Sequence, residues 1–366
     1  MEMLPRYAQL LVQYSLDIQP GDKLLIRTTT LAEPLVREVY RLALRAGAAV
    51  DIEWEFEAMS SIFAQEATNT ALQHVSPTYQ RAMETYQAYL YILAPFSVQH
   101  EHSLSGEKAA LRQQILQAAQ TNYTRRTADR SLKRTLCLYP TDASAQEAGM
   151  PTEEYARFVF NACRLYDDNP TESWLQVRQS QQHIVDMLNQ RTHIRYQGPG
   201  TDLSFSTQGR TWINSDGQTN MPSGEVYTSP VENSVNGVVH FSLPAIYQGT
   251  ELENVTLYVK DGFIEKWEAT RGKSLLDTIF AEVAGSRYFG EAAIGTNYHI
   301  QQQTKNILFD EKMGGTIHLA IGQSYLQAGG QNHSAIHWDF ITDMTREGRI
   351  YADHQLIYEN GQFLNV

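Results

Sequence analysis

The stretch Pro20–Trp54, PGDKLLIRTTTLAEPLVREVYRLALRAGAAVDIEW, decides the fold class of the first half of this chain. After a Pro-Gly turn, Leu24–Arg27 is a short apolar run that predicts a strand. Glu33–Ala46 then repeats apolar residues at helical spacing and ends at Gly47, a residue typical of helix C-termini. Val50–Trp54 predicts the next strand, so the stretch has the strand–helix–strand order of a parallel sheet flanked by helices.

The same alternation continues along the chain to about residue 190. It predicts two further strands, Ala88–Ala94 and Leu136–Tyr139, and three helices, Glu107–Ala119, Glu153–Tyr166 and Trp174–Gln190. We therefore predict an N-terminal α/β domain over residues 1–190, in which helices flank a mostly parallel sheet.

The second half has a different pattern, rich in short strands joined by turns. Asp261-Gly262 joins two strand-like runs and is a strong signal for a two-residue hairpin. Only Ser274–Val283 has clear helical periodicity. Further strands are expected at Val238–Leu243, Val255–Lys260, Phe263–Thr270, Thr316–Ile321, Ala335–Ile341 and around Asn360-Gly361. We predict a mixed, antiparallel-rich α+β domain over residues 191–366 and expect the chemistry to lie there.

Composition excludes some classes of partner. The 366 residues carry a formal net charge of -12, with 41 acidic and 29 basic side chains, whereas nucleic-acid binding depends on neutralising phosphates with Lys and Arg. The longest apolar run, Ala88–Phe96, is too short to span a membrane. The N-terminus shows no signal peptide, and the two cysteines, Cys137 and Cys163, lie in apolar contexts typical of buried thiols. We expect a cytoplasmic protein with no nucleic-acid or membrane partner.

Two glutamates of the second half each follow a glycine. Glu225 lies in NMPSGEVYTSP (220–230), between two extended stretches, and Glu291 lies in RYFGEAAIGTN (287–297), where small apolar residues follow it. A buried carboxylate is costly unless it is paired or binds a metal. The alternative for Glu225 is an exposed residue of a hairpin loop.

Two histidines and an aspartate lie in the later strands. His318 lies among apolar neighbours in DEKMGGTIHLAIGQSY (310–325), where a buried histidine of the core is the alternative. His337 and Asp339, in SAIHWD (334–339), are two residues apart, so in a strand they point to one face. An imidazole and a carboxylate on one face are good ligands for a divalent ion. By contrast, His100-Glu101-His102 lacks the spacing of a metalloprotease helix and is expected to face solvent.

These four segments, together with YPTDASAQEAGM (139–150), resemble the thermophilic metallo-aminopeptidase family of aminopeptidase T, aminopeptidase S and PepS. The resemblance covers the whole chain and implies two divalent ions per subunit, such as zinc or cobalt, and a homodimer that acts on peptides. It carries the metal ligands onto Glu225, Glu291, His318, His337 and Asp339, and the tyrosine of the site onto Tyr325. The family usually has Pro where Leu326 stands, and the segment between Tyr325 and His337 looks short.

For the mechanism, we expect Glu225, Glu291 and Tyr325 to be catalytic. Tyr325 is expected to stabilise the oxyanion, and either glutamate to move the proton, with Glu311 as a supporting partner. Two rival functions stay open from the sequence. One is another dinuclear metallohydrolase, such as an amidase or a carboxypeptidase. The other is a non-catalytic protein that binds a small ligand at the strand ends of its α/β half.

Overall fold

The structure of this chain is a computed structural model that describes residues 3–97, 104, 106–247 and 249–364. The predicted His100-Glu101-His102 loop lies outside these residues. The chain divides into two compact units, the first formed by residues 1–173 and 217–222 and the second by residues 174–216 and 223–366. That the chain forms domains of residues 1–190 and 191–366 stays a prediction.

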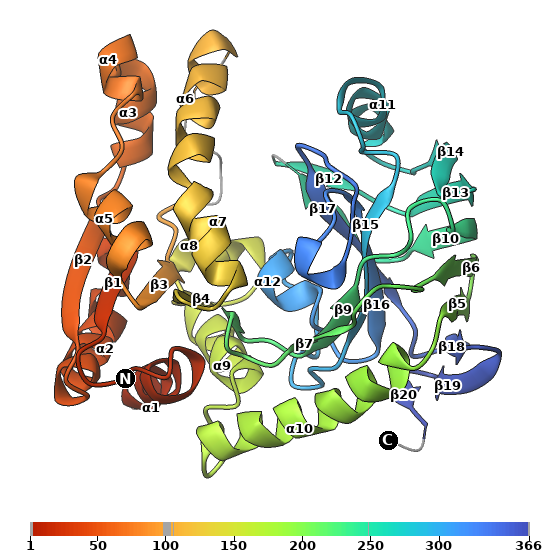
Figure 1. Cartoon of the computed structure of the whole chain (residues 1–366), viewed down its shortest axis with the longest axis horizontal. Coiled ribbons are helices and arrows are strands. Elements are labelled where there is room, and N and C mark those ends of the chain that lie inside the picture. Colours follow the sequence, from red (N-terminus) through yellow and green to blue (C-terminus); the bar gives the residue numbers. More distant parts are fainter. Residues whose placement is uncertain (1–2, 98–103, 105, 248, 365–366) are drawn as a thin grey trace. The chain divides into compact units, whose positions relative to one another are not determined.

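The first unit is built on a parallel sheet of five strands in the order β2-β1-β3-β4-β8 (Figure 1). Each neighbouring pair runs parallel, as the strand–helix–strand pattern of the sequence predicts. Its strands are β1 Lys23–Thr29, β2 Ala49–Glu55, β3 Ala88–Leu93, β4 Lys133–Leu138 and the short β8 Asn220–Met221.

Helices surround this sheet, and they are more numerous than the sequence predicts. The predicted helices appear as α2 Glu33–Arg45, α6 Gly106–Ala119, α9 Thr152–Ala162 and α10 Pro170–Asn189, which crosses into the second unit. The structure adds α1 Met3–Leu10, the π-helical turn η1 Leu11–Ser15, the 3-10 turn η2 Thr30–Ala32, α3 Met59–Glu66, α4 Asn69–Leu72, α5 Pro77–Thr85, α7 Thr121–Ala128 and α8 Asp142–Glu147.

The packing of the first unit shows why these helices form. Leu25 on β1 and Tyr89 on β3 are register partners and pack with Ala82 and Met83 of α5. Tyr89 also makes edge contacts with Tyr79 of α5 and with Tyr123 of α7. The sheet thus buries an apolar and aromatic face under α5 and α7, two helices whose short, polar sequences gave little periodicity.

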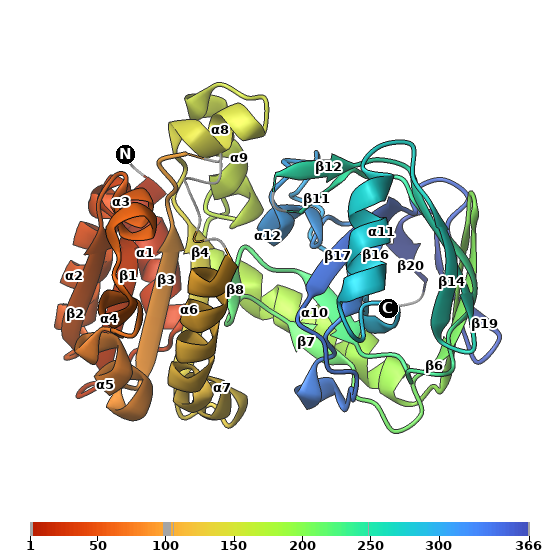
Figure 2. The same ribbon diagram turned by 90° about the horizontal axis from the view of Figure 1, so that it is seen from above.

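The second unit contains two antiparallel sheets and a small hairpin (Figure 2). The larger sheet has the order β14-β13-β10-β6-β5-β18-β19-β20, and the smaller has the order β17-β16-β15-β9-β7. The larger comprises β5 His193–Gly198, β6 Thr201–Ser206, β10 Asn236–Phe241, β13 Val255–Lys260, β14 Phe263–Glu268, β18 Arg349–Ala352, β19 Gln355–Glu359 and β20 Gln362–Phe363. The smaller comprises β7 Ile213–Ser215, β9 Glu225–Thr228, β15 Phe289–Gly295, β16 Thr316–Gly322 and β17 His337–Asp343. The hairpin joins β11 Ala245–Tyr247 to β12 Thr250–Leu252.

One apolar core connects the two sheets. It combines Leu203, Val239 and Leu257 of the larger sheet with Ile294, Leu319 and Phe340 of the smaller one. Helix α10 and the helix α11 Lys273–Glu282 contribute further side chains to this core, among them Leu188 and Ile279. The smaller sheet therefore has one face against the core, and its other face is available for polar residues.

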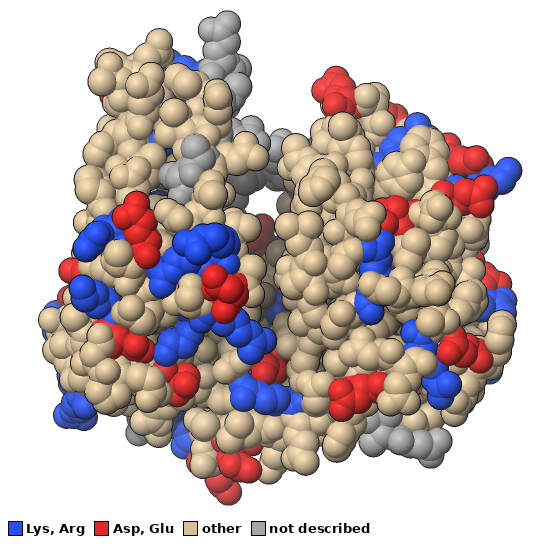
Figure 3. Space-filling view, in the orientation of Figure 1, with Lys and Arg blue, Asp and Glu red and all other residues tan. Residues whose placement is uncertain are grey.

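The predicted fold class is confirmed. The parallel α/β unit and the antiparallel-rich unit both appear, and Asp261-Gly262 joins β13 to β14 as expected. Both cysteines are buried, and neither forms a disulfide bond. Among the described residues we find no helix long and apolar enough to cross a membrane. Acidic and basic side chains are interspersed over the visible surface of each unit (Figure 3).

Candidate metal centre

The five residues predicted as metal ligands lie on four adjacent strands of the smaller sheet. Glu225 begins β9, and Glu291 lies within β15. His318 lies within β16, and both His337 and Asp339 lie at the start of β17. Because these strands are consecutive in the order β17-β16-β15-β9, segments far apart in the sequence meet on one sheet.

The register of the sheet brings these side chains to one face. Ala320 on β16 pairs with Glu291 on one side and with Asp339 on the other. His318 is two residues from Ala320 and therefore points to the same face. Glu225 pairs with Gly295, which is four residues from Glu291 and shares its face. All five predicted ligands consequently project from the same side of the sheet.

Small residues leave room between these side chains. Ala293 and Gly295 on β15, and Ala320 and Gly322 on β16, occupy the same face as the ligands. The intervening residues point the other way and join the apolar core, among them Ala292, Ile294, Ile317, Leu319, Trp338 and Phe340. The two-residue period of each strand thus separates a polar site from the core.

A glycine precedes Glu225 at the start of β9. Gly224 has a φ of +114°, and a Cβ atom there would lie only 2.7 Å from the Cβ atom of Asn297. The backbone N–H of Thr296 also donates to the Gly224 carbonyl over 2.8 Å. Only glycine allows this conformation and this close approach, which fixes the start of β9 against the end of β15.

The predicted ligands lie within contact distance of one another. Glu291 is central, because its Oε2 atom lies 3.0 Å from Nε2 of His337 and its Oε1 atom lies 3.6 Å from Nε2 of His318. His318 Nε2 is also 3.4 Å from Oε2 of Glu225. His337 Nε2 is 3.7 Å from Oδ1 of Asp339. One carboxylate therefore faces both imidazoles, each of which faces a second carboxylate.

A backbone carbonyl fixes the tautomer of His337. Its Nδ1 atom lies 2.8 Å from the carbonyl oxygen of Gln323, which can only accept a hydrogen bond. Nδ1 therefore carries the proton, and Nε2 is left to face Glu291 and Asp339. Partners of this kind orient the histidines of metal sites and set which nitrogen binds the ion.

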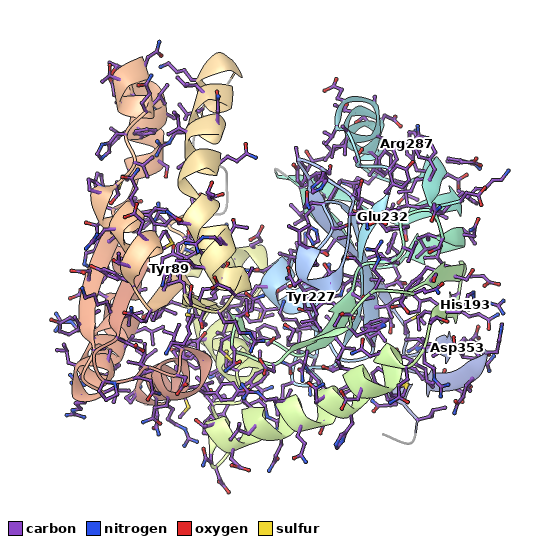
Figure 4. The ribbon with its side chains drawn as sticks, in the orientation of Figure 1. Tyr89, His193, Tyr227, Glu232, Arg287 and Asp353 are labelled. Carbon is purple, nitrogen blue, oxygen red and sulfur yellow. The ribbon has the colours of Figure 1, made fainter. Side chains whose placement is uncertain are left out.

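Tyr325 lies next to these ligands. Its ring centroid is 5.0 Å from that of His337 and 5.0 Å from that of Tyr227, which projects from β9 two residues beyond Glu225 (Figure 4). Its backbone N–H donates to Oγ of Ser229 over 3.1 Å. The hydroxyl of Ser229 in turn donates to the carbonyl of Gly290, next to Glu291. Tyr325 is thus held by its backbone and by two ring contacts.

The sequence of the chain matches the model of the thermophilic metalloprotease (M29) family over residues 1–363. The chain belongs to this M29 family. Among its relatives, aminopeptidase 2 of Geobacillus stearothermophilus is 29% identical over 92% of this chain and 91% of the relative. Aminopeptidase AmpS of Bacillus subtilis (strain 168) is 27% identical over 99% of this chain and 98% of the relative.

The fold also matches a solved structure, that of wild-type AmpT from Thermus thermophilus. The TM-score is 0.84, at 22% sequence identity and with 99% of each chain covered, so the likeness shows the shared fold. Family membership makes this chain a metal-dependent peptidase, a hydrolase of peptide bonds.

The residues of this M29 site fit a metal. Three overlapping groups have ligand atoms within 4.8 Å of one another, namely Glu225–Glu291–His318, Glu291–His337–Asp339 and Glu311–His318–Asp339. Several of these atoms are buried and make no hydrogen bond, specifically Oε2 of Glu225, both ring nitrogens of His318 and Oδ1 of Asp339. Buried polar atoms are normally satisfied, so these four unsatisfied atoms indicate a missing partner. Imidazole and carboxylate donors are those that zinc and related divalent ions prefer.

Burial and close contact shift the pKa values of these groups in the metal-free chain. Burial raises the pKa of Glu225 to about 7 and that of Asp339 to about 6. Burial alone would also raise the pKa of Glu291, but the nearby imidazoles of His318 and His337 lower it to about 2. Burial alone would lower the pKa of each histidine, but the carboxylates raise it to about 9 for His318 and about 10 for His337.

Two further residues, Glu311 and Lys312, lie beside the predicted ligands, and the sequence analysis had named only Glu311. Glu311 was expected as a supporting partner, and it joins a ligand group with His318 and Asp339. Lys312 was missed. Its side chain is fully buried and its Nζ atom contacts Glu311 and lies 3.6 Å from Oε1 of Glu225. The signal was present in the segment DEKMGG (310–315), but lysine is so rarely buried that its position gave no reason to single it out.

Glu291 lies inside β15, and every residue of this strand is buried. A register shift next to Glu291 accompanies Gly290, where a Cβ atom would lie 2.2 Å from the carbonyl oxygen of Gln323. The glycine thus serves a close approach of two strands.

Proposed function

We propose that this M29 metalloprotease is an aminopeptidase that removes N-terminal amino acids from peptides with the help of two divalent ions. Glu225, Glu291 and His318 would hold one ion, and Glu291, His337 and Asp339 the other. The observation that carries the proposal is the position of Glu291, whose two oxygens face different imidazoles 3.0 Å and 3.6 Å away. A shared carboxylate of this kind is what a pair of ions about 3.5–4 Å apart requires.

The two ions, zinc, cobalt or a similar transition metal, would supply Lewis-acid chemistry that activates water and polarises the substrate carbonyl. Each ion position offers three protein ligands, which leaves coordination sites for water and substrate. The carbonyl of Gln323 and the backbone around Gly290 would keep His337 and Glu291 oriented whether or not substrate is bound.

Tyr325 would donate a hydrogen bond to the oxygen on which negative charge develops. Burial and the nearby Glu291 and Asp339 raise the pKa of Tyr325 well above its ordinary value, so its hydroxyl keeps its proton. A protonated phenol is a donor, as an oxyanion-stabilising group must be. Its contacts with Tyr227 and Ser229 hold the ring in place before substrate arrives.

A carboxylate must also carry a proton from the attacking water to the leaving amine. Glu291 faces both imidazoles and would be the poorer base, because a carboxylate shared by two ions has little free basicity. Glu225 is needed at the first ion position. Glu311 is required by neither position, yet it lies within reach of His318 and Asp339. We therefore assign proton transfer to Glu311, ahead of the two glutamates that the sequence offered.

The names of the relatives favour an aminopeptidase over a carboxypeptidase.

Assembly, location and partners complete the proposal. The family resemblance supports a homodimer, and two buried cysteines that form no disulfide are typical of the reducing cytoplasm. The acidic net charge of -12 supports peptides, and not nucleic acids or anionic membranes, as partners.

The experiment that tests this function combines metal analysis with substrate choice. We expect purified protein to carry about two divalent ions per chain, and to cleave aminoacyl p-nitroanilides but not their N-acetylated forms. A chelator should abolish turnover, and Co²⁺ or Zn²⁺ should restore it. Cleavage of the N-acetylated substrates would favour another metallohydrolase. A protein that binds no stoichiometric ions and turns over neither substrate would favour the ligand-binding alternative.

A further inference from the structure

Lys312 is a cation enclosed in the metal centre. Its side chain has no exposed surface, and its Nζ atom contacts the carboxylate of Glu311 and lies 3.6 Å from Oε1 of Glu225. Lysine is almost never fully buried unless it is paired, because removing an ammonium group from water is costly. The two carboxylates are therefore the reason that this side chain can lie here, and the lysine in turn holds them.

The backbone at Lys312 is fixed to the same turn that places Glu225. The carbonyl of Lys312 accepts the backbone N–H of Asn297 over 2.9 Å, and its own N–H donates to the carbonyl of Phe309 over 3.0 Å. The side-chain amide of Asn297 donates to the carbonyl of Ser223 over 2.8 Å. Lys312 thus approaches Glu225 from a hydrogen-bonded loop, and its buried side chain does not reach across solvent.

The charge around Lys312 depends on whether metal ions are bound. Without ions, the site contains four clustered carboxylates, those of Glu225, Glu291, Glu311 and Asp339, and their charge is offset by Lys312 and by the two imidazoles. With two divalent ions bound, the same carboxylates are neutralised and the lysine faces further positive charge. The attraction between Lys312 and its neighbours is consequently strongest in the metal-free chain.

We propose that Lys312 is a positioning residue that acts as a built-in counter-ion of the metal-free site. It holds Glu225 and Glu311 in place before the ions bind and so stabilises the site in its metal-free form. This inference rests on the proposed function in one respect, the binding of ions by Glu225 and its neighbours. It makes no use of the catalytic step itself.

The test compares Lys312→Met with wild type in metal-free and in Zn²⁺-loaded form, using calorimetric unfolding at pH 7.5. Methionine keeps the length and most of the volume of the side chain but removes its charge. We expect the variant to lower the unfolding temperature of the metal-free protein by about 5 °C or more beyond its effect on the loaded protein. Ions would therefore stabilise the variant more than they stabilise wild type.

A matched control and a second variant keep this test decisive. Lys266→Met removes an exposed lysine of the same unit, whose partner Glu268 is also exposed. It should change the unfolding temperatures of the metal-free and the Zn²⁺-loaded protein equally and only slightly. Glu311→Gln/Lys312→Met removes the contacting pair together and should recover part of the metal-free loss. If Lys312→Met folds only with metal, it can be purified with Zn²⁺ and then stripped, and its failure to stay folded would support the inference.

The inference is overturned if Lys312→Met lowers the unfolding temperature equally with and without Zn²⁺, because a lysine that only fills space would do this. A double variant with no recovery would also contradict it. Failure of the proposed function gives a different result, because in that case wild type itself would bind no stoichiometric Zn²⁺. If wild type binds Zn²⁺ but Lys312→Met lowers the unfolding temperature equally with and without Zn²⁺, only the role of Lys312 is contradicted.

Discussion

Glu291 and Asp339 lie on opposite sides of a single residue, Ala320, in one row across the smaller sheet. Side chains directly opposite one another on neighbouring antiparallel strands have Cβ atoms about 4.5–5.5 Å apart. Because the side chain of Ala320 is small, the two carboxylates can occupy the space above it on this face of the sheet. His337, two residues before Asp339, then reaches Glu291 over 3.0 Å. The register of three strands, more than any single motif, brings these proposed metal ligands together.

Glu291→Gln is expected to remove the centre with little change in the fold. The amide is nearly isosteric but uncharged, so neither ion position keeps its shared ligand. We expect at least one of the two ions to be lost and kcat/KM to fall by a factor of about 10³ or more, which corresponds to about 4 kcal/mol. Metal analysis and steady-state kinetics on the same preparation check both effects.

Glu265→Gln, on the exposed side of β14, is the matched control and should retain wild-type ion content and turnover. Circular dichroism should be the same for both variants. A Glu291→Gln enzyme that keeps two ions and full turnover would remove Glu291 from the proposed ligand set.

Part of this site follows directly from local sequence patterns. The spacing of His337 and Asp339 indicates one strand face, and the structure places both on that face of β17. Gly224 before Glu225 indicates a close backbone approach, and the structure shows one, to Asn297. Each of these inferences needs only residues that are close in sequence, and such local signals are the most reliable.

Other features could not be read locally. Which face of β16 carries His318 depends on its pairing with β15 and β17, and a shift of one residue would turn it into the core. Lys312 is buried between Glu311 and Glu225, and the second of these partners is far away in sequence. Helices α5 and α7 form against Leu25 and Tyr89 of the sheet, so tertiary packing stabilises them more than their own periodicity does.

The two histidines are expected to respond differently to alanine. His337 keeps about a quarter of its side chain exposed, at 26%, whereas His318 is buried at 1%. His337→Ala should therefore lose ion binding and activity while its unfolding temperature without metal changes by at most about 2 °C. His318→Ala should lose ion binding as well and also destabilise the metal-free protein, because it leaves a cavity beside unpaired carboxylates.

Thermal unfolding of both variants after chelator treatment checks this contrast. His354→Ala, on the surface of the same unit, serves as a control that should alter neither ion content nor stability appreciably. Equal destabilisation by the two site variants would contradict the burial argument.

Tyr325→Phe isolates the role of the phenol hydroxyl. The ring contacts with Tyr227 and His337 can persist in phenylalanine, so ion binding and folding should not change. We expect kcat to fall by about 10²-fold with little change in KM, because the lost hydrogen bond acts mainly in the transition state. Tyr40→Phe, at an exposed tyrosine of α2, should leave both constants unaltered. A change confined to KM would indicate a role in substrate binding.

The buried thiols of the first unit give a prediction for pH. Burial raises the pKa of Cys137 from 9.0 to about 12, although a hydrogen bond with Tyr7 acts against this shift. Burial raises the pKa of Cys163 in the same direction. In the unfolded chain both thiols ionise near pH 8.5, so above this pH the unfolded state releases protons that the folded state keeps. The pKa of each thiol is thus higher in the folded chain than in the unfolded chain. The stability that the protonated thiols contribute is therefore fully present below about pH 8.5 and is lost as the pH rises toward 12.

We therefore expect the free energy of unfolding of the first unit to fall above about pH 8.5, by up to about 1.4 kcal/mol per pH unit for each thiol. Urea unfolding at pH 7.5, 9 and 10 measures this slope. Other groups titrate in the same window, so the comparison with Cys137→Ala isolates the thiol. The variant should be less stable at pH 7.5 because of its cavity, but its stability should decline less steeply with pH. Parallel pH profiles for the variant and wild type would show that Cys137 ionises equally in both states, which its burial does not allow.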